Sequence, residues 1–259
     1  MHIPGDLSDL LHAVAADFPA ILAGNLVGIY LWGSLTYNAF NEACSDVDFV
    51  VVTRHRVNDD EFSKLDDWFK AKKEENRWVE RIDMRVVIDG EFLDKTSQCC
   101  GFYHYLERLV RHESDGNPII WLNIGQCGIT LWGVDAKRIA PPVSNQCLND
   151  ALMLELAYLR KDLASNVGDR SPKAFVHNAY AILTACRILY SAHHRSLVSK
   201  QQACDWALET IPRRWHAVVQ QASENRLKNG GSTTQQLEED AKGFVEYVTA
   251  EVKRMLISE

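Results

Sequence analysis

The sequence of 259 residues predicts an α+β protein, with a small mixed β-sheet in its first part and an α-helical bundle in its second. Apolar, β-branched runs of strand length, bounded by glycine or polar residues, occur in the first part. Beyond residue 145 the apolar residues recur at positions i, i+3 and i+4, the spacing of amphipathic helices. Two prolines within 140–144 indicate a linker. We therefore expect two domains, at 1–140 and 145–259.

The first domain is predicted to alternate helices and strands. Apolar residues with helical spacing predict a helix at 7–23, and an apolar strand at 26–32 follows it. A second strand is predicted at 46–52. A charged, amphipathic helix at 58–77 then crosses over to a third strand at 81–88. The first domain is therefore expected to contain a sheet whose strands are joined by a helical crossover.

The remaining segments are predicted to complete the sheet and to form the second domain. Apolar segments at 118–121 and 128–133 are expected to be further strands of the small mixed sheet. A glycine-containing segment at 228–232 predicts a flexible turn between helices of the second domain. The spacing of apolar residues predicts helices at 148–165, 173–193, 199–210 and 233–257.

Composition and charge favour a small-molecule substrate over nucleic acid. The hydrophobic content of 46% is ordinary for a globular protein, and the net charge of −7 does not favour binding to a polyanion. The seven cysteines have no metal-binding spacing, so we expect reduced thiols in a cytoplasmic protein. We expect neither a secretion signal nor a membrane span, and among oligomeric states a monomer is favoured.

Two aspartates open the strand at 46–52 and form the most informative local pattern. Because side chains alternate along a strand, Asp46 and Asp48 project to the same side of the sheet. Two carboxylates this close repel each other unless a cation lies between them, and Mg²⁺ binds carboxylates together with substrate phosphates. An isolated D-x-D can also be a solvated turn, but the apolar strand that follows favours a metal site.

Gly33 and Ser34 are the candidate phosphate-binding residues, because they directly follow the apolar strand at 26–32. The glycine allows the backbone to approach a phosphate group closely, and the serine hydroxyl and N–H can bond to its oxygens. A strand, a Gly-Ser turn, a connector and the D-x-D strand in this order predict a site for a metal-bound nucleotide.

Gly33-Ser34 together with Asp46 and Asp48 resembles the signature of the DNA polymerase β-like nucleotidyltransferase superfamily. The resemblance implies transfer of a nucleoside monophosphate from an NTP to a hydroxyl, with two metal ions. It also implies a third carboxylate on a later strand of the same sheet.

Asp83, on the strand at 81–88, is the candidate for that third carboxylate. The resemblance leaves open whether it acts as a metal ligand, as the general base, or as both. The alternative interpretation is a solvent-facing acid that pairs with a basic neighbour, Arg81 or Arg85.

Segments at 181–192, 199–209 and 244–248 are similar to the C-terminal helical domain of the aminoglycoside (3″)(9) adenylyltransferases, which modify streptomycin and spectinomycin. The resemblance implies that Arg187 and Lys200 contact the phosphates of ATP. Positive groups at these positions would bind the triphosphate and stabilise charge on the leaving pyrophosphate. Alternatively, Arg187 pairs with a carboxylate and Lys200 is a solvated cation.

The chain departs from the family pattern at its base and at its acceptor residues. The family has a glutamate as general base, whereas this chain has Asp83, which is one methylene shorter. The family binds its acceptor through tryptophans and through acids, and the acid positions here hold Lys173 and His177. Asp162 or Asp169 could supply the acidic contact instead, or could be solvated acids at a helix end. The acceptor is therefore less closely specified than the nucleotide.

These patterns together predict an ATP-dependent nucleotidyltransferase that moves AMP to a hydroxyl of an aminoglycoside of the streptomycin/spectinomycin type and so confers antibiotic resistance. The expected cofactors are ATP and two Mg²⁺ ions held by Asp46, Asp48 and Asp83. A different acceptor is the first alternative. A HEPN-type toxin–antitoxin component, with a ribonuclease motif at Arg187 and His193, is the second. A binding module without catalysis is the third, and the presence of all three carboxylates disfavours it.

Overall fold

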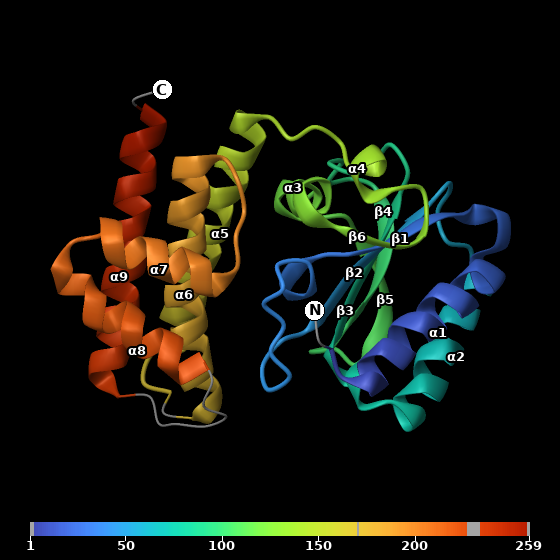
Figure 1. The fold of residues 1–259 in the computed structure, drawn as a ribbon, viewed down its shortest axis with the longest axis horizontal. Helices are drawn as coiled ribbons and strands as arrows, with labels where there is room; N and C mark the ends of the chain where they lie inside the picture. The colour runs from blue at the N-terminus through green and yellow to red at the C-terminus, as the bar shows by residue number, and fades with distance from the viewer. Residues whose placement is uncertain (1–2, 170, 227–233, 258–259) are drawn as a thin grey trace. The chain divides into compact units, whose positions relative to one another are not determined.

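The computed structural model of the chain describes residues 3–169, 171–226 and 234–257. The chain forms two compact units, Met1–Pro142 and Val143–Glu259 (Figure 1). The first unit contains a β-sheet with helices, and the second is built from helices among its described residues. The predicted α+β class, with a mixed sheet followed by a helical domain, is therefore confirmed.

The sheet of the first unit has six strands in the order β5-β4-β3-β2-β1-β6 (Figure 1). The strands are β1 (Leu26–Leu31), β2 (Val47–Thr53), β3 (Ile82–Ile88), β4 (Gln98–Tyr103), β5 (Arg108–Glu113) and β6 (Ile129–Gly133). β2 and β3 are parallel, and every other neighbouring pair is antiparallel. A parallel pair needs a crossover connection, and the predicted helix α2 (Asp59–Glu75) provides it.

Helices α1 (Gly5–Leu22) and α2 pack on one face of the sheet and form the core of this unit (Figure 1). α2 starts with a capping box, in which Asn58 accepts from the Glu61 N–H and Glu61 accepts from the Asn58 N–H. The rings of Phe69 on α2 and Phe102 on β4 stack 4.1 Å apart. The opposite face carries Asp48 and Asp83 at the starts of β2 and β3, and the buried Val50 and Val52 further along β2.

Helix α1 differs from expectation in one respect. The segment Gly5–Asn25 is long and apolar enough to cross a membrane by length and composition, although no such run was expected from the sequence. Six of its apolar residues are buried in the core of the first unit. They are Leu7, Leu10, Leu11, Val14, Phe18 and Leu22. On the same helix Asp17 accepts a hydrogen bond of 2.8 Å from the indole N–H of Trp68.

One prediction for the first unit needs correction, and one hairpin of its sheet was not predicted. The segment 118–121 was expected to be a strand, but it begins helix α3 (Pro118–Cys127). Proline fits the first turn of a helix, and the Asn117 side chain caps it by accepting from the Ile119 N–H at 3.0 Å. The strands that complete the sheet instead include the β4–β5 hairpin, which the sequence pattern did not indicate. β6 confirms the strand expected at 128–133, and the short helix α4 (Ala136–Ile139) follows it.

The second unit confirms the four predicted helices and adds one. The helices are α5 (Asn145–Ser165), α6 (Pro172–His194), α7 (Lys200–Thr210), α8 (His216–Arg226) and α9 (Gln235–Ile257). α6 is central, since it packs against each of the other four, and its Ala181, Ile182 and Ala185 are fully buried. α8 was not predicted. The turn predicted at 228–232 lies outside the described residues.

Candidate functional site

The Gly33-Ser34 turn lies where β1 ends, in a short 3-10 turn (Gly33–Leu35). The Trp32 N–H donates to the Asp48 carbonyl at 3.1 Å, which fixes this turn beside the start of β2. Gly33 has a φ of +70°, and a Cβ at this position would collide with the Asp48 carboxylate. A glycine is therefore required here both by the left-handed backbone and by the close approach of Asp48.

Asn123 holds the same turn from the other side, a role that no local pattern in the sequence indicates. This buried residue of α3 accepts from the Gly33 N–H through Oδ1 at 3.1 Å. The Thr36 hydroxyl donates to the Gly33 carbonyl at 2.8 Å. Ser34 Oγ, by contrast, is buried and has no hydrogen-bond partner among the described residues. Within the Gly-Ser pair, the serine hydroxyl is therefore the group left for a ligand oxygen.

The three predicted carboxylates lie together at the start of β2 and β3. Asp48 on β2 is directly opposite Asp83 on β3 in the parallel register, and neighbouring strands are about 4.8 Å apart. Asp46 lies one residue before β2, on the less buried side of an alternating pattern in which Ser45 and Val47 are buried. The expectation that Asp46 and Asp48 share a face is therefore consistent with the structure.

Asp83 lies in an environment that disfavours its charge. Burial raises the pKa of the Asp83 carboxyl, and the negative charges of Asp46 and Asp115 raise it further, whereas Arg85 and His104 lower it. Arg85 is engaged in an ion pair with Asp115. In the part of the chain that the structure describes, Asp83 Oδ1 is buried and has no hydrogen-bond partner. Asp83 is therefore not solvent-facing, and no ion pair joins it to Arg81 or Arg85 among the described residues, although the charge of Arg85 acts on it.

The donor set fits Mg²⁺, although it is not a closed cage. Within residues 3–169, 171–226 and 234–257, no group of three His, Cys, Asp or Glu side chains could hold a metal ion. Mg²⁺ is usually bound by one or two carboxylates, with water and substrate phosphates completing its octahedron. Asp48 lies beside Asp83, whose Oδ1 has no partner in the described structure, and this pair suits such an incomplete shell. The assignment of Asp46, Asp48 and Asp83 as metal ligands remains a prediction.

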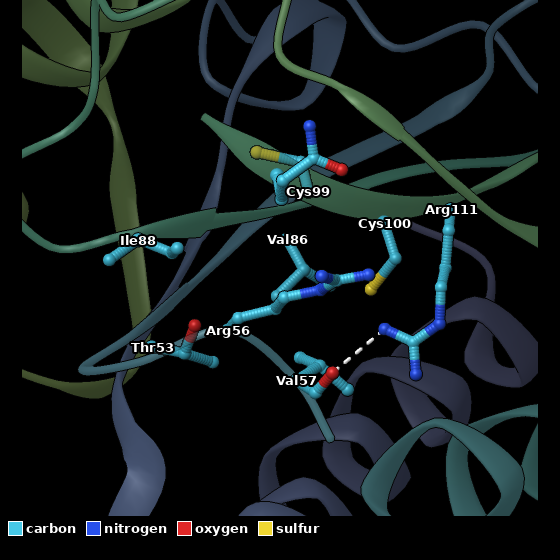
Figure 2. A pocket seen from close by; sticks show the side chains of 9 residues that line it. Thr53, Arg56, Val57, Val86, Ile88, Cys99, Cys100 and Arg111 are labelled. Atoms are coloured by element: carbon cyan, nitrogen blue, oxygen red, sulfur yellow. Dashed lines mark hydrogen bonds between the residues drawn. The ribbon is translucent and has the colours of Figure 1, made fainter. Parts of the chain in front are cut away.

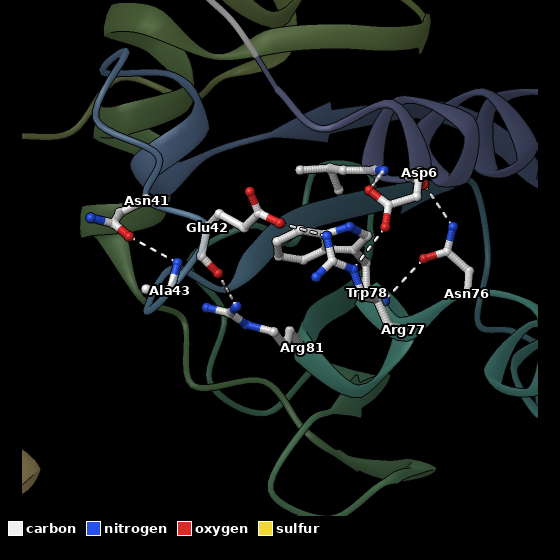
Figure 3. Close-up of polar contacts among 9 residues, drawn as sticks. Asp6, Asn41, Glu42, Ala43, Asn76, Arg77, Trp78 and Arg81 are labelled. Atoms are coloured by element: carbon white, nitrogen blue, oxygen red, sulfur yellow. Dashed lines mark hydrogen bonds and ion pairs between the residues drawn. The ribbon is translucent and has the colours of Figure 1, made fainter. Parts of the chain in front are cut away.

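Ion pairs hold the connector that leads to the aspartates (Figure 3). Arg77 donates to Asp6 at 2.7 Å and to the Glu42 carboxylate at 2.6 Å, and Arg81 donates to the Glu42 carbonyl at 2.6 Å. Both guanidinium groups lie over the ring of Trp78. These contacts tie the connector before β2 to the turn before β3, so the two segments that carry the carboxylates are fixed to each other.

Arg187 and Lys200 lie around Tyr180 in the second unit. The Lys200 Nζ is 4.3 Å from the centroid of the Tyr180 ring. Burial and the nearby Glu155 raise the pKa of Tyr180, whereas Arg187 lowers it. Arg187 Nε is buried without a hydrogen-bond partner, and no carboxylate pairs with this arginine among the described residues. The alternative of a structural ion pair at Arg187 is therefore not supported.

The predicted acceptor residues are partly engaged with each other. His177 on α6 lies 3.4 Å from Asp162 on α5, between Nδ1 and Oδ2. Asp169 accepts from the Ser171 N–H at 2.8 Å, next to the start of α6. The side chain of Lys173 lies outside the described part of the molecule. Asp162 therefore lies beside His177, which occupies one of the two positions where the family has an acid.

The geometry of α6 argues against the ribonuclease motif. Six residues separate Arg187 from His193, which places them about 120° apart around the helix. His193 is exposed at the end of α6, where its ring centroid lies 5.2 Å from that of Trp206. The two side chains therefore do not share one face.

A separate cavity lies at the other end of the parallel strands (Figure 2). It is lined by Thr53 and Ile88, the last residues of β2 and β3, and by Arg111 on β5. Arg111 donates to the Val57 carbonyl at 2.8 Å and ion-pairs with Asp59. The length of β2 separates this cavity from Asp48, so it is not part of the aspartate site.

Two family models match the chain. Residues 11–99 match a nucleotidyltransferase domain, which contains Gly33, Ser34 and the three aspartates. Residues 138–251 match the C-terminal domain of aminoglycoside adenylyltransferases, which contains Arg187 and Lys200.

Curated proteins and solved structures give the same pattern. A spectinomycin 9-adenylyltransferase of Campylobacter jejuni is 22% identical over 251 residues, which cover 92% of this chain and 93% of that protein. An aminoglycoside (3″)(9) adenylyltransferase of Klebsiella pneumoniae is 31% identical over 134 residues, 49% of this chain and 45% of that protein. The structure of the spectinomycin adenyltransferase AAD(9) from Enterococcus faecialis, with ATP and spectinomycin, has a TM-score of 0.70 at 16% identity. It covers 96% of this chain and 98% of that one, and it shows a shared fold.

Proposed function

Since the chain belongs to the aminoglycoside adenylyltransferases, with a nucleotidyltransferase domain followed by that family's C-terminal domain, we propose that it transfers AMP from ATP to a hydroxyl of spectinomycin or a related antibiotic. The observation that carries the proposal is the register of β2 and β3. It places Asp48 beside Asp83 at the strand ends next to the Gly33-Ser34 turn.

Asp83 is the proposed general base. Its carboxylate has an oxygen without a partner among the described residues, so a substrate hydroxyl can donate to it. The raised pKa makes the ionised form a stronger base than an exposed aspartate. Its side chain is one methylene shorter than the family's glutamate, so the acceptor hydroxyl has to approach β3 more closely.

Asp46 and Asp48 are the proposed Mg²⁺ ligands, with Asp83 as a further ligand in a two-ion site. Bound Mg²⁺ would neutralise phosphate charge and lower the pKa of the acceptor hydroxyl. Ser34 Oγ, buried and without a partner in the described structure, donates to a phosphate oxygen. Arg187 and Lys200 supply positive charge for the triphosphate and for the leaving pyrophosphate.

The acceptor is proposed to be of the spectinomycin type. The match to the Campylobacter jejuni spectinomycin enzyme covers nearly the whole chain, whereas the match to the (3″)(9) enzyme covers just under half of that protein. The pairing of His177 with Asp162 leaves fewer free acids for a polycationic streptomycin. ATP, the proposed co-substrate, is found inside the cell. A cytoplasmic location and a role in antibiotic resistance are therefore part of the proposal.

The test is a pyrophosphate-release assay with purified protein, Mg²⁺ and ATP, with spectinomycin, streptomycin and a lincosamide in separate arms. We expect release with spectinomycin, a smaller rate with streptomycin and none with the lincosamide. Mass spectrometry should show that the antibiotic gains one AMP. GTP and CTP in place of ATP test the nucleotide, and EDTA should stop release. Absence of transfer to both antibiotics would overturn the proposed acceptor class.

A further inference from the structure

Two buried polar atoms without partners belong to residues where β3 begins and just after β4 ends. Asp83 on β3 is directly opposite Tyr103 on β4, and His104 is the next residue along the chain. Throughout the described residues, Asp83 Oδ1 and His104 Nδ1 find no hydrogen-bond partner although both are buried. The aspartate has a place in the proposed reaction, whereas nothing so far accounts for the histidine.

The neighbouring polar groups are already engaged with one another. Arg85, which lies two residues after Asp83 on the same strand, ion-pairs with Asp115. The Tyr103 hydroxyl and His112 Nε2 are hydrogen-bonded at 2.8 Å. These contacts leave Asp83 Oδ1, His104 Nδ1 and the Nε of Arg85 as the buried atoms without partners around this strand end, among the described residues. Arg85 already has a carboxylate partner through its Nη1, whereas the His104 ring has none for its Nδ1.

Leaving a buried polar atom unsatisfied costs free energy, so two such atoms at neighbouring positions of the sheet require an explanation. His104 is close enough for its charge to act on the Asp83 carboxyl. A ligand that presents oxygen or nitrogen atoms to both groups would remove the cost.

Mg²⁺ is not that ligand for His104. Hard cations of this kind prefer oxygen donors, and an imidazole nitrogen suits zinc, copper or iron instead. A nucleotide phosphate can bind the Ser34 hydroxyl, and it does not require the histidine. The remaining substrate is the acceptor, which carries several hydroxyl groups on one ring.

We propose that His104 binds the acceptor, with its imidazole nitrogen hydrogen-bonded to a hydroxyl adjacent to the one that reacts. The proposal rests on the function proposed above. Binding of one hydroxyl by His104 orients the neighbouring hydroxyl towards Asp83, which receives its proton. An acceptor with two hydroxyls on adjacent ring carbons therefore fits this site better than one with an isolated hydroxyl.

The test compares His104→Ala, His104→Asn and, as matched control, His55→Ala. His55 is exposed at the far end of β2, and the same substitution there removes an imidazole remote from the site. For His104→Ala we expect the KM for the acceptor to rise about tenfold or more, since a lost hydrogen bond of about 1.4 kcal/mol is tenfold in binding. The KM for ATP should stay within about twofold. His104→Asn keeps a side-chain hydrogen-bonding group near the position of Nδ1. Its KM for the acceptor should therefore be close to that of the wild type.

Three outcomes decide the matter. An unchanged acceptor KM in His104→Ala, with an active wild-type enzyme, would refute the role of His104 and leave the proposed function standing. A wild-type enzyme that adenylylates no antibiotic would refute the proposed function itself. Equal increases in the KM for the acceptor and the KM for ATP, without rescue by asparagine, would show a structural role of His104 and would also refute the inference. Thermal melting of each variant, in parallel, separates loss of fold from loss of binding.

Discussion

The polar side chains at the two ends of the parallel pair β2–β3 differ in whether they have hydrogen-bond partners within the protein. At the start, Asp83 Oδ1 and Ser34 Oγ are buried without partners among the residues that the structure describes. At the far end, Arg111 donates to two carbonyls and to Asp59, and its guanidinium lies 4.4 Å from the centroid of the Phe62 ring. The polar groups of Arg111 at the far end are bonded within the protein, whereas the start has buried oxygens without partners, as the proposed function requires. We call the start of the strand pair the proposed reactive end and the other the stabilising end.

Removal of a carboxylate at the reactive end should have the largest effect. Asp48→Asn keeps the shape of the side chain and removes its charge, so we expect transfer to fall by about 10³-fold through loss of the charge that holds Mg²⁺. The measurement is pyrophosphate release with saturating ATP and spectinomycin. Asp59→Asn is the matched control, because it removes a carboxylate at the far end, and its activity should match that of the wild type. Persistent activity in Asp48→Asn would remove this residue from the site.

Asp83→Asn should lower activity and raise stability together. Transfer should fall by about 10²-fold, because an amide cannot accept the proton of the acceptor hydroxyl. The raised pKa means that the folded state binds a proton more tightly than the unfolded state, so the ionised Asp83 destabilises the fold at neutral pH. At pH 7 and without metal, the Asp83→Asn variant should therefore unfold at a higher urea concentration than the wild type. This difference should shrink as the pH falls through the pKa of folded Asp83. A less stable variant at pH 7 would contradict the inferred cost of the buried charge.

Gly33→Ala tests the close approach of the turn to Asp48. A Cβ would both strain the left-handed backbone, at about 1–3 kcal/mol, and push the Asp48 carboxylate aside. We expect activity to fall about tenfold with a lower melting temperature. Gly90→Ala is the matched control, since Gly90 also has a positive φ, of +82°, but a Cβ there would meet no atom within 4 Å. It should lose stability without losing activity; equal loss of activity in both variants would show that strain alone is responsible.

Arg111→Ala should have the smallest effect on activity and a clear effect on stability. Loss of its bonds to Val57 and Asp59 should lower the free energy of unfolding by about 2 kcal/mol. The KM and kcat of transfer should stay within about twofold of the wild type. Urea denaturation and the pyrophosphate assay measure the two quantities on the same preparation. A large loss of kcat in a folded variant would mean that the far end takes part in catalysis.

Local pattern was sufficient to predict much of this protein. The alternation of side chains along a strand predicted that Asp46 and Asp48 share a face, and apolar spacing predicted α1, α2, α5, α6, α7 and α9. Both are periodic signals that depend on neighbouring residues. The apolar segment at 118–121 was assigned to the wrong element because a short apolar run fits a buried strand as well as a helix. The β4–β5 hairpin and α8 have weaker periodicity and were missed.

The two-part α+β organisation, the Gly-Ser turn and the aspartate strand can all be read from the amino-acid sequence, because each is encoded in a short stretch of chain. Which polar groups are satisfied and which are left for a ligand depends instead on the packing of distant segments. Asn123 holds Gly33 from 90 residues away, and Asp115 engages Arg85 from 30 residues away. Local spacing carries no information about such pairings. For this reason the open oxygen of Asp83 and the buried nitrogen of His104 became visible only in the folded chain.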